Sequence, residues 1–487
     1  MTALARTGRS VRLDELTGSD FDLVVIGGGI VGSGVARDAA LRGLRVGLID
    51  RHDFAFGTSS RSSRLLHGGL RYLEQGRIGL VREASVEKKT IQHIAPHLVR
   101  PLGFVFPAYR GNGRPMWQLR IGVKLYDWLC RDGNFLPSTA LSPAQTVATA
   151  PGLDSARLAG AVRYADALTN DARLVLDTLR SAERHDAVIA NRVRFHDAVR
   201  ENETWRVIAE DVLTGRELTL RARTLVNATG PWAQQIPHSQ VRLRLSKGIH
   251  IVIERTRLPV HDALVLGEGK RILFVLPWGE RVIIGTTDTD YDGAPEDVAV
   301  EPQDIRYLLN VVNGAFPQLG LTAGEVISSW AGLRPLIAQP DGSPSDISRA
   351  HEIRQSRPCW WDVTGGKLTT YRLMAEQTVD EIQRHLGKTR SESRTAHEPL
   401  LKPGDEGYSG VEPPTLCRDA VRHFLEHEWA CSLDDIMVRR SSWHYASTDL
   451  PKTATQVAHW MGELLGWSTE QTDAAVDNYL RMNRANA

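Results

Sequence analysis

The chain contains 487 residues, with 59 lysines and arginines against 58 aspartates and glutamates and a formal net charge of +1. This balance argues against a general nucleic-acid-binding protein. The fractions of hydrophobic (42%) and charged (24%) residues are typical of a globular protein with room for about three domains.

The four cysteines lie far apart and form no C-x-x-C pair, so we expect reduced thiols, a cytoplasmic location and no metal site. No apolar stretch of the sequence approaches the length that a membrane span needs. Residues 1–20 lack the apolar core of a signal peptide, and we expect them to form a disordered lead-in.

Residues 22–50 contain the most informative pattern of the chain. An apolar run leads into a G-x-G-x-x-G turn, a helix of small residues follows, and a second apolar run ends on Asp50. The turn and the N-terminus of the helix suit a pyrophosphate, and a carboxylate about 20 residues further on suits a ribose hydroxyl. The pattern predicts a dinucleotide site without separating NAD from FAD. Its three glycines are Gly27, Gly29 and Gly32.

Residues 57–72 form a polar, glycine-containing segment directly after this unit. Hydroxyl groups can donate to a phosphate or to a ring carbonyl, and adjacent glycines allow the backbone to approach a flat ring. A polar surface loop is the alternative, but the place of the segment beside the nucleotide motif favours a cofactor contact. The candidate cofactor residues are Ser59, Ser60, Ser62, Ser63, His67, Gly68 and Gly69.

Two helices are expected next, over residues 80–97 and 116–130. The second carries an apolar stripe, with Arg120 and Lys124 off it. A basic amphipathic helix with tryptophans can lie on a membrane surface, but such a helix more often packs on its own protein, and both interpretations stay open. The stripe consists of Trp117, Ile121, Leu125, Trp128 and Leu129.

The middle of the chain has the pattern of β-structure. Residues 205–209 and 217–221 predict a hairpin, and residues 224–228 predict a short strand that ends at a second glycine turn, Thr229-Gly230. The three runs HIVIE, ILFVL and RVIIG between residues 250 and 285 are typical of an antiparallel sheet, which a βαβ fold alone would not supply. We therefore expect a substrate domain inserted into the nucleotide domain.

The last third of the chain is expected to be mainly helical. A glycine turn at residues 365–366 precedes a periodic helix whose positive end lies at residues 366–369. Residues 402–414 have the composition of a Pro/Gly linker, and a small α-helical domain follows it.

Seven blocks that occur in one order along the chain resemble the family of FAD-dependent (aerobic, respiratory) glycerol-3-phosphate dehydrogenases. The resemblance runs from about residue 22 to residue 372 and favours FAD over NAD. It implies oxidation of sn-glycerol 3-phosphate to dihydroxyacetone phosphate, with the electrons passed to a membrane quinone. The blocks are SSRSSRLLHGGLRYLE, VNATGPW, SKGIHIVI, FVLPW, IIGTTDTDY, AGLRPL and GGKLTTYR.

The resemblance implies an α/β fold with a Rossmann-like FAD-binding domain of the glutathione-reductase/D-amino-acid-oxidase type. We expect this oxidoreductase domain over residues 21–400 and a C-terminal helical domain over residues 401–487. The FAD-binding parts are expected at about 21–95, 155–245 and 350–390, and the substrate-domain parts at about 96–154 and 246–349.

The resemblance also implies the site residues. It places Arg71, Tyr72, Arg334 and Arg349 in the substrate site, with His250 and Lys367 beside them. Cofactor contacts are expected from Thr229, Gly230, Gly366, Lys367, Leu368 and Thr369 in addition to the residues of the first βαβ unit and its loop.

The oxidation of a phosphorylated alcohol requires such residues independently of the resemblance. A phosphate dianion held out of water needs guanidinium groups, and Arg334 lies in an apolar stretch where an unpaired charge would be costly. The C2 hydroxyl must lose a proton as its carbon loses a hydride, so a base is needed there. His250 is the predicted base, with His67 as its rival. Lys367 is suited to stabilise developing negative charge.

Two other interpretations stay open. An oxygen-using flavin oxidase of glycerol 3-phosphate, or of a related small substrate, would have the same fold. A non-catalytic flavin-binding protein is the third alternative, but it would not need a cluster of cations at the site. A homodimer and a peripheral membrane contact also stay open, because the C-terminal region looks shorter than in the family. The electron acceptor stays open because the sequence does not distinguish quinone from oxygen.

The chain departs from the family pattern at two places. Ala350 and His351 stand where the family has an acidic residue followed by an aromatic one, which puts the role of Arg349 in question. Asp50 replaces the more usual glutamate at the ribose position, a difference of one methylene group.

Overall fold

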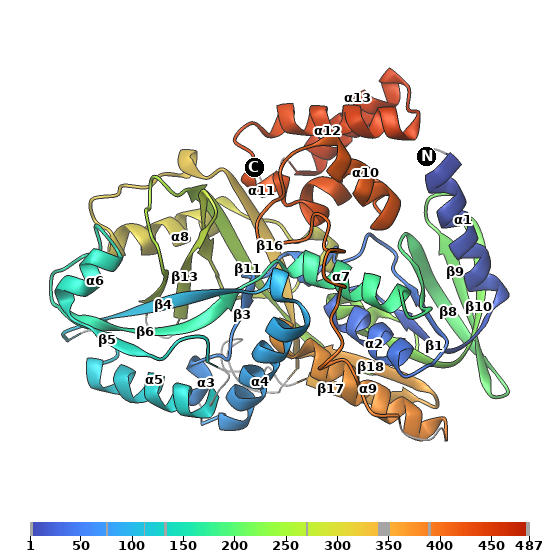
Figure 1. The fold of residues 1–487 in the computed structure, drawn as a ribbon, viewed down its shortest axis with the longest axis horizontal. Coiled ribbons are helices and arrows are strands. Elements are labelled where there is room, and N and C mark those ends of the chain that lie inside the picture. Colours follow the sequence, from blue (N-terminus) through green and yellow to red (C-terminus); the bar gives the residue numbers. More distant parts are fainter. Residues whose placement is uncertain are drawn as a thin grey trace.

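The computed structural model describes residues 3–74, 76–111, 113–130, 134–268, 271–338, 351–387 and 391–483. Figure 1 shows two β-sheets, each accompanied by helices, and a cluster of C-terminal helices above them. The predicted α/β architecture, with an antiparallel substrate-domain sheet and a C-terminal helical domain, is confirmed.

The first sheet is the nucleotide-binding one. Five of its strands run parallel in the order β18-β10-β1-β2-β7, and antiparallel strands flank them. The predicted hairpin is formed by β9 and β10. Its strands are β1 (Asp20–Ile26), β2 (Val46–Ile49), β7 (Val188–Ala190), β8 (Val193–Glu201), β9 (Thr204–Asp211), β10 (Arg216–Asn227), β17 (His351–Arg357) and β18 (Trp360–Gly365).

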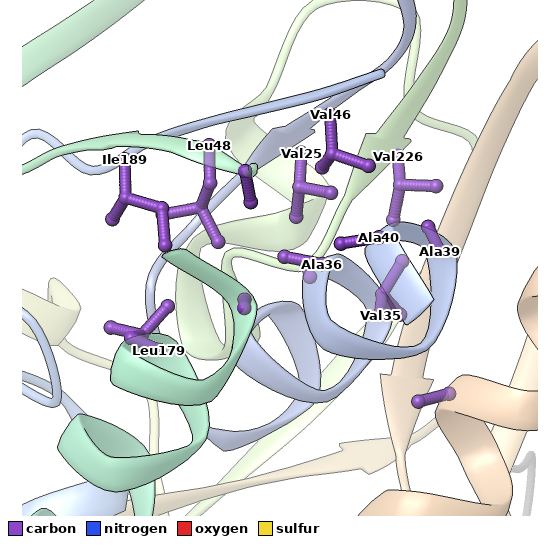
Figure 2. Close-up of a cluster of buried hydrophobic side chains, with 14 of the residues drawn as sticks. Val25, Val35, Ala36, Ala39, Ala40, Val46, Leu48, Leu179, Ile189 and Val226 are labelled. Atoms are coloured by element: carbon purple, nitrogen blue, oxygen red, sulfur yellow. The ribbon is translucent and has the colours of Figure 1, made fainter. Parts of the chain in front are cut away.

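Helices α2 (Ile30–Leu41), α7 (Asp171–Glu183) and α9 (Tyr371–His385) pack against one another and against this sheet. Figure 2 shows how small residues of α2 meet the branched side chains of the strands. Because alanine has a short side chain, the helix lies close to the sheet, and its first turn comes near the strand ends. The labelled core residues are Val25, Val35, Ala36, Ala39, Ala40, Val46, Leu48, Leu179, Ile189 and Val226.

The second sheet has ten strands and is mainly antiparallel. The predicted strands at residues 250–285 are found as β11, β13 and β14. The strands are β3 (Leu65–Leu66), β4 (Arg100–Tyr109), β5 (Thr139–Leu141), β6 (Leu158–Leu168), β11 (Leu243–Glu254), β12 (Ala263–Glu268), β13 (Arg271–Trp278), β14 (Arg281–Gly285), β15 (Thr289–Tyr291) and β16 (Ser328–Ile337). Nearby helices are α3 (Arg71–Glu74), α4 (Ile78–Ile94), α5 (Met116–Cys130), α6 (Pro143–Thr149) and α8 (Pro302–Ala315).

The C-terminal helices are fixed to the nucleotide domain by buried ion pairs. Arg173 of α7 makes two hydrogen bonds, of 2.6 and 2.8 Å, to the carboxylate of Glu428. Arg440 donates to Asp53, which follows the first βαβ unit, at 2.8 Å. The helices are α10 (Arg418–His427), α11 (Trp443–Ala446), α12 (Leu450–Leu465) and α13 (Thr469–Asn483).

The expectation of a disordered lead-in over residues 1–20 is wrong for most of this segment. Residues Ala3–Gly18 form helix α1. Leu13 and Leu16 are buried, and Arg9 donates to Asp211 at 2.6 Å. The partner lies some 200 residues away in the sequence, so local composition carried no sign of this contact.

Helix α5 presents its predicted stripe mostly to the outside. Trp117, Ile121 and Trp128 are 65, 60 and 70% exposed, whereas Leu129 is buried with the opposite face. Figure 1 shows α5 at the periphery, away from the C-terminal helices. The helix therefore packs on its own protein through another face, and its tryptophans stay exposed. Among the helices in the described ranges, none combines the length and apolarity needed to span a bilayer.

Candidate active site

The glycine motif forms the turn between β1 and α2, as predicted. Gly29 is the N-cap residue of α2, and Gly27 donates its N–H to the carbonyl of Ile49 at 2.8 Å. A Cβ atom at Gly32 would collide with the carbonyl oxygen of Gly27, so only glycine allows this close approach of helix and turn. The arrangement leaves the helix N-terminus facing the end of the strand, where a phosphate is favoured.

Asp50 lies at the end of β2 beside this turn. Its carboxylate accepts the backbone N–H groups of Gly28 and His52, each at 2.7 Å. Burial raises the pKa of Asp50 to about 6, although the two hydrogen bonds act in the opposite direction. The position suits the acceptor of a ribose hydroxyl, because each carboxylate oxygen has a further lone pair.

The predicted hydroxyl loop folds back over the helix N-terminus. Ser59 accepts the N–H of Ile30, in the first turn of α2, at 3.0 Å. Ser62 accepts the N–H of Arg64, and Ser63 lies 2.8 Å from His250 Nε2. Ser60 is buried, and its hydroxyl has no hydrogen-bond partner among the described residues. Ser59 therefore lies at the glycine turn, where a dinucleotide is expected, whereas Ser63 reaches β11 of the second sheet.

A cavity of about 470 Å³ opens between the two sheets. Its lining combines polar side chains with apolar side chains of β4, β13 and α5, including Phe104, Phe274 and Leu125. It brings together many of the predicted residues from distant parts of the chain. These are Ser59, Ser62, Ser63, His67, Gly69, Tyr72, His250, Arg334, Gly366, Lys367, Leu368 and Thr369.

His250 is held rigidly in the wall of the cavity. It lies on β11, opposite Gly285 of β14, and its ring stacks on Trp330 with the centroids 5.0 Å apart. Ser63 meets Nε2, while Nδ1 is buried and makes no hydrogen bond within the described part of the chain. Burial, and then the charges of Arg334 and Arg64, lower the pKa of His250 well below its usual value. The imidazole is therefore neutral, as a base must be.

Arg334 reaches the same cavity from β16. Its Nη2 donates to Thr286 Oγ1 at 2.9 Å, and its Nη1 donates to the carbonyl of Thr287 at 3.3 Å. Asp288 Oδ1 lies 3.5 Å from Nη1. The Thr-Thr-Asp turn therefore fixes the plane of the guanidinium group, which is suited to bind a phosphate or carboxylate through two bonds.

Lys367 lies two residues after the end of β18 and precedes a 3-10 turn, Leu368–Thr370, with α9 beginning at Tyr371. The helix predicted to start at residues 366–369 thus begins slightly later, after this turn. Lys367 Nζ lies 3.8 Å from the ring centroid of Tyr72. Thr369 Oγ1 accepts the N–H of His67 at 3.2 Å, which ties the two cofactor loops together.

Several predicted residues do not line the cavity or cannot be placed. Thr229 and Gly230 follow β10 outside the cavity lining, with Thr229 Oγ1 donating to Asn227 at 2.7 Å. A Cβ atom at Gly27 would lie 3.1 Å from Thr229 Cα, so this second glycine turn adjoins the first. Gly27, Gly29, Gly32, Asp50, Ser60 and Gly68 surround the nucleotide turn and loop but do not line this cavity. Arg71 belongs to α3, but its side chain is outside the described part, as are Arg349 and Ala350 entirely.

The sequence analysis did not single out the residues that support the site. Thr286, Thr287 and Asp288 fix Arg334, while Trp330 stacks on His250 and also contacts Arg64. The turn was visible only as part of the block IIGTTDTDY. The surroundings of Arg64 could not be predicted from the sequence, because its neighbours come from strands and helices far away in the chain.

The chain is similar to known proteins in both sequence and fold. A family described as FAD dependent oxidoreductase matches residues 22–380. The aerobic glycerol-3-phosphate dehydrogenase of Staphylococcus haemolyticus is 34% identical over 420 residues, which cover 84% of this chain and 75% of that protein. Glycerol-3-phosphate dehydrogenase 2 of Mycobacterium tuberculosis is 34% identical over 539 residues, covering 98% and 90%. The solved glycerol-3-phosphate dehydrogenase of Bacillus halodurans, complexed with FAD, has a TM-score of 0.77 and 27% identity, covering 99% of this chain and 98% of that one.

Proposed function

The chain belongs to the FAD-dependent oxidoreductase family, and from this premise we propose that it oxidises sn-glycerol 3-phosphate to dihydroxyacetone phosphate and passes the electrons to a membrane quinone. The protein is an enzyme, and its cofactor is FAD. One observation carries the proposal: a neutral, buried histidine and two cations from separate elements meet in one cavity beside the cofactor loops.

The residues present fit FAD. The turn at Gly27 to Gly32 and the N-terminus of α2 suit its pyrophosphate, and Asp50 suits its ribose. The buried hydroxyl of Ser60 has no hydrogen-bond partner in the described part of the chain, and it lies in the same loop as Ser59, which reaches the helix N-terminus. When bound, the flavin accepts the hydride and carries the redox chemistry, whereas the protein supplies binding, orientation and electrostatics.

The polar side chains of the cavity lining fit an anionic, hydroxylated substrate. Arg334 would bind the phosphate, and Lys367 would stabilise negative charge that develops during the reaction. His250 would accept the proton of the C2 hydroxyl as the C2 hydride leaves. We propose that Arg71 and Arg349 add further guanidinium groups to the phosphate site, and that Tyr72 positions Lys367.

The exposed face of α5 supports a membrane-bound acceptor. Ile121 is both exposed on this face and part of the cavity lining. Trp117 and Trp128 flank it, and Arg120 and Lys124 are exposed on the same helix. Tryptophans and cations together suit the interface of an anionic lipid bilayer. We propose that the enzyme binds the cytoplasmic face of the membrane through α5, so that a quinone reaches the apolar side chains that α5 contributes to the cavity lining.

The test separates the two half-reactions. The purified, yellow protein is mixed anaerobically with sn-glycerol 3-phosphate, and the flavin band is followed. Rapid bleaching is expected, and in the His250→Gln variant it should slow far more than binding weakens.

Reduced enzyme is then mixed with a short-chain ubiquinone or with oxygen. Faster reoxidation by the quinone supports a dehydrogenase, whereas faster reoxidation by oxygen makes the protein an oxidase. A flavin that stays oxidised contradicts the substrate.

A further inference from the structure

Arg64 is a buried cation that the proposed reaction does not yet use. Its guanidinium carbon lies 4.7 Å from the ring centroid of Trp278, 5.2 Å from that of Tyr445 and 5.5 Å from that of Trp330. These rings come from β13, from helix α11 of the C-terminal domain and from β16. The side chain of Arg64 is 1% exposed. Three aromatic faces attract a cation electrostatically, but they offer it no hydrogen-bond acceptors in the plane of the group.

The charge of Arg64 is only partly compensated. The nearest carboxylate contact is Asp171, whose Oδ1 lies 3.9 Å from Nε. The Nε and Nη1 atoms donate no hydrogen bond within the described part of the chain. A guanidinium group cannot release its proton at ordinary pH, so a full positive charge stays in the interior. Burial of a partly compensated charge costs folding free energy, so a cation retained at this position indicates a functional role.

Arg64 is linked to His250 in two ways. Trp330 contacts both groups, because it stacks on the imidazole at 5.0 Å and also lies against the guanidinium group. The preceding residue, Ser63, lies 2.8 Å from His250 Nε2. Arg64 itself has a φ of 55°, so the backbone turns sharply at this residue. The side chain of Arg64 therefore anchors the turn that brings Ser63 to the imidazole.

Charged groups approach His250 from several elements. Neither β11, which carries His250, nor the opposite strand β14 places a charged group against the imidazole, since the partner of His250 on β14 is Gly285. Strand β16 contributes Arg334, and the loop after the glycine unit contributes Arg64, and both charges disfavour an imidazolium. Asp288 lies 3.5 Å from Arg334 and Asp171 lies 3.9 Å from Arg64, so each of these arginines has a carboxylate near it. Lys367 lines the same cavity.

We propose that Arg64 is a positioning residue of the reaction: caged by three aromatic rings, it holds Trp330 and Ser63 against the His250 imidazole, which accepts the substrate proton. The cage needs Tyr445, so the C-terminal domain takes part in building the active site. The inference rests on the proposed function. In that reaction the C2–H bond breaks with its electron pair going to the flavin, the O–H proton goes to the imidazole, and a C=O bond forms.

The two arginines would then act at different stages. A phosphate dianion that binds Arg334 offsets this charge, which makes the imidazole a better proton acceptor once substrate is present. Arg64 lies outside the cavity lining, among aromatic rings, so no substrate reaches it and its charge stays constant. Together with burial, it therefore keeps the pKa of His250 low in the complex as well as in the free enzyme.

The decisive measurement is the pH dependence of anaerobic flavin reduction in Arg64→Gln. Removing the cation raises the pKa of His250, so the pH at which the rate falls on the acid side should rise by about one unit. Arg64→Lys keeps the charge and should restore the native profile. Arg163→Gln, which removes a cation paired with Asp262 in the same sheet, is the control and should leave the profile unchanged. Superimposable profiles of native and Arg64→Gln enzyme would overturn the proposal.

A second measurement does not depend on turnover. The sixteen histidines are labelled with ¹³C at Cε1, and the His250 resonance is identified as the one missing from His250→Gln. In the native protein this resonance should not titrate near pH 6.5, and in Arg64→Gln its midpoint should move up by about one unit. Tyr445→Leu should shift it in the same direction, whereas Tyr445→Phe, which keeps the ring, should not. A native protein that sn-glycerol 3-phosphate fails to bleach would contradict the proposed function, yet this titration would still decide the role of Arg64.

Discussion

Gly285 stands directly opposite His250 in the ladder between β14 and β11, and a Cβ atom at Gly285 would collide with Cδ2 of the imidazole. The ring therefore occupies the space that a side chain at position 285 would fill. Because Trp330 stacks on the ring, the imidazole has little freedom to move away. The orientation of the proposed base is thus determined by a residue that has no side chain.

The first prediction concerns Gly285→Ala. The added methyl group should displace the imidazole by a fraction of an ångström to about one ångström, and a misplacement of that size lowers a rate by about 100-fold. Stopped-flow flavin reduction measures the effect, and the flavin content of the purified protein should be unchanged. Gly267→Ala is the control, because its Cβ would lie 3.9 Å from Phe106 in ordinary contact. Equal reduction rates in native and Gly285→Ala enzyme would contradict the orientation described for His250.

Arg334→Ala tests the phosphate site. The loss of charge-assisted hydrogen bonds should weaken binding of sn-glycerol 3-phosphate by about 1.5–3 kcal/mol, or 10- to 100-fold. Arg334→Lys should recover only part of this affinity, because an ammonium group cannot form the same two parallel bonds. The substrate concentration that gives half-maximal flavin reduction measures both effects. An unchanged value in Arg334→Ala would exclude this residue as the phosphate ligand.

Much of this architecture could be predicted from local sequence. The turn from Gly27 to Gly32 depends on spacing within a few residues, and the strands of the substrate domain depend on short apolar runs with turns between them. His250, Arg334 and Lys367 were named from blocks that resemble a known family, and the fold brings them to one cavity. In each case the relevant information lies within about ten residues of the sequence.

What could not be predicted depends on contacts between distant segments. Helix α1 is stabilised by Leu13, Leu16 and the bond from Arg9 to Asp211, none of which a local composition reveals. An apolar stripe with tryptophans has the same pattern whether it faces a core or a membrane, so the outward face of α5 was not decided by periodicity. The cage of Arg64 combines rings from three elements, and only the folded chain brings them together.

The exposed face of α5 gives a prediction about membranes. Each tryptophan contributes apolar area to an interface, and removing both should lower the affinity for lipid by at least about tenfold. We expect Trp117→Ser/Trp128→Ser to sediment less with vesicles that contain phosphatidylglycerol, while flavin reduction in solution is unchanged. Val199→Ser, at an exposed apolar residue of β8, should bind like the native protein. Binding should also decrease with added salt, because Arg120 and Lys124 contribute electrostatically. Native protein that does not bind such vesicles would contradict the proposed docking face.

The last prediction concerns the acid stability of the C-terminal domain. Burial lowers the pKa of His444 to about 4, although the charge of Asp434 acts in the opposite direction, and His444 Nδ1 lies 2.6 Å from the hydroxyl of Tyr479. As the pH falls below about 6.5, the unfolded chain binds a proton at this histidine while the folded chain does not until about pH 4. The free energy of unfolding should therefore decrease as the pH falls through this window, by up to about 3 kcal/mol from this residue alone.

His444→Asn should remove this part of the pH dependence. Asparagine keeps a polar group near Tyr479 but does not titrate, so the melting temperature of the variant should change less than that of the native protein between pH 7 and pH 4.5. The melting temperature is measured by far-UV circular dichroism at several pH values. His196→Asn is the control, because His196 is exposed on β8. If the melting temperature depends on pH equally in native protein and in His444→Asn, the acid sensitivity belongs to other groups. The buried His250, with its lowered pKa, is then the next candidate.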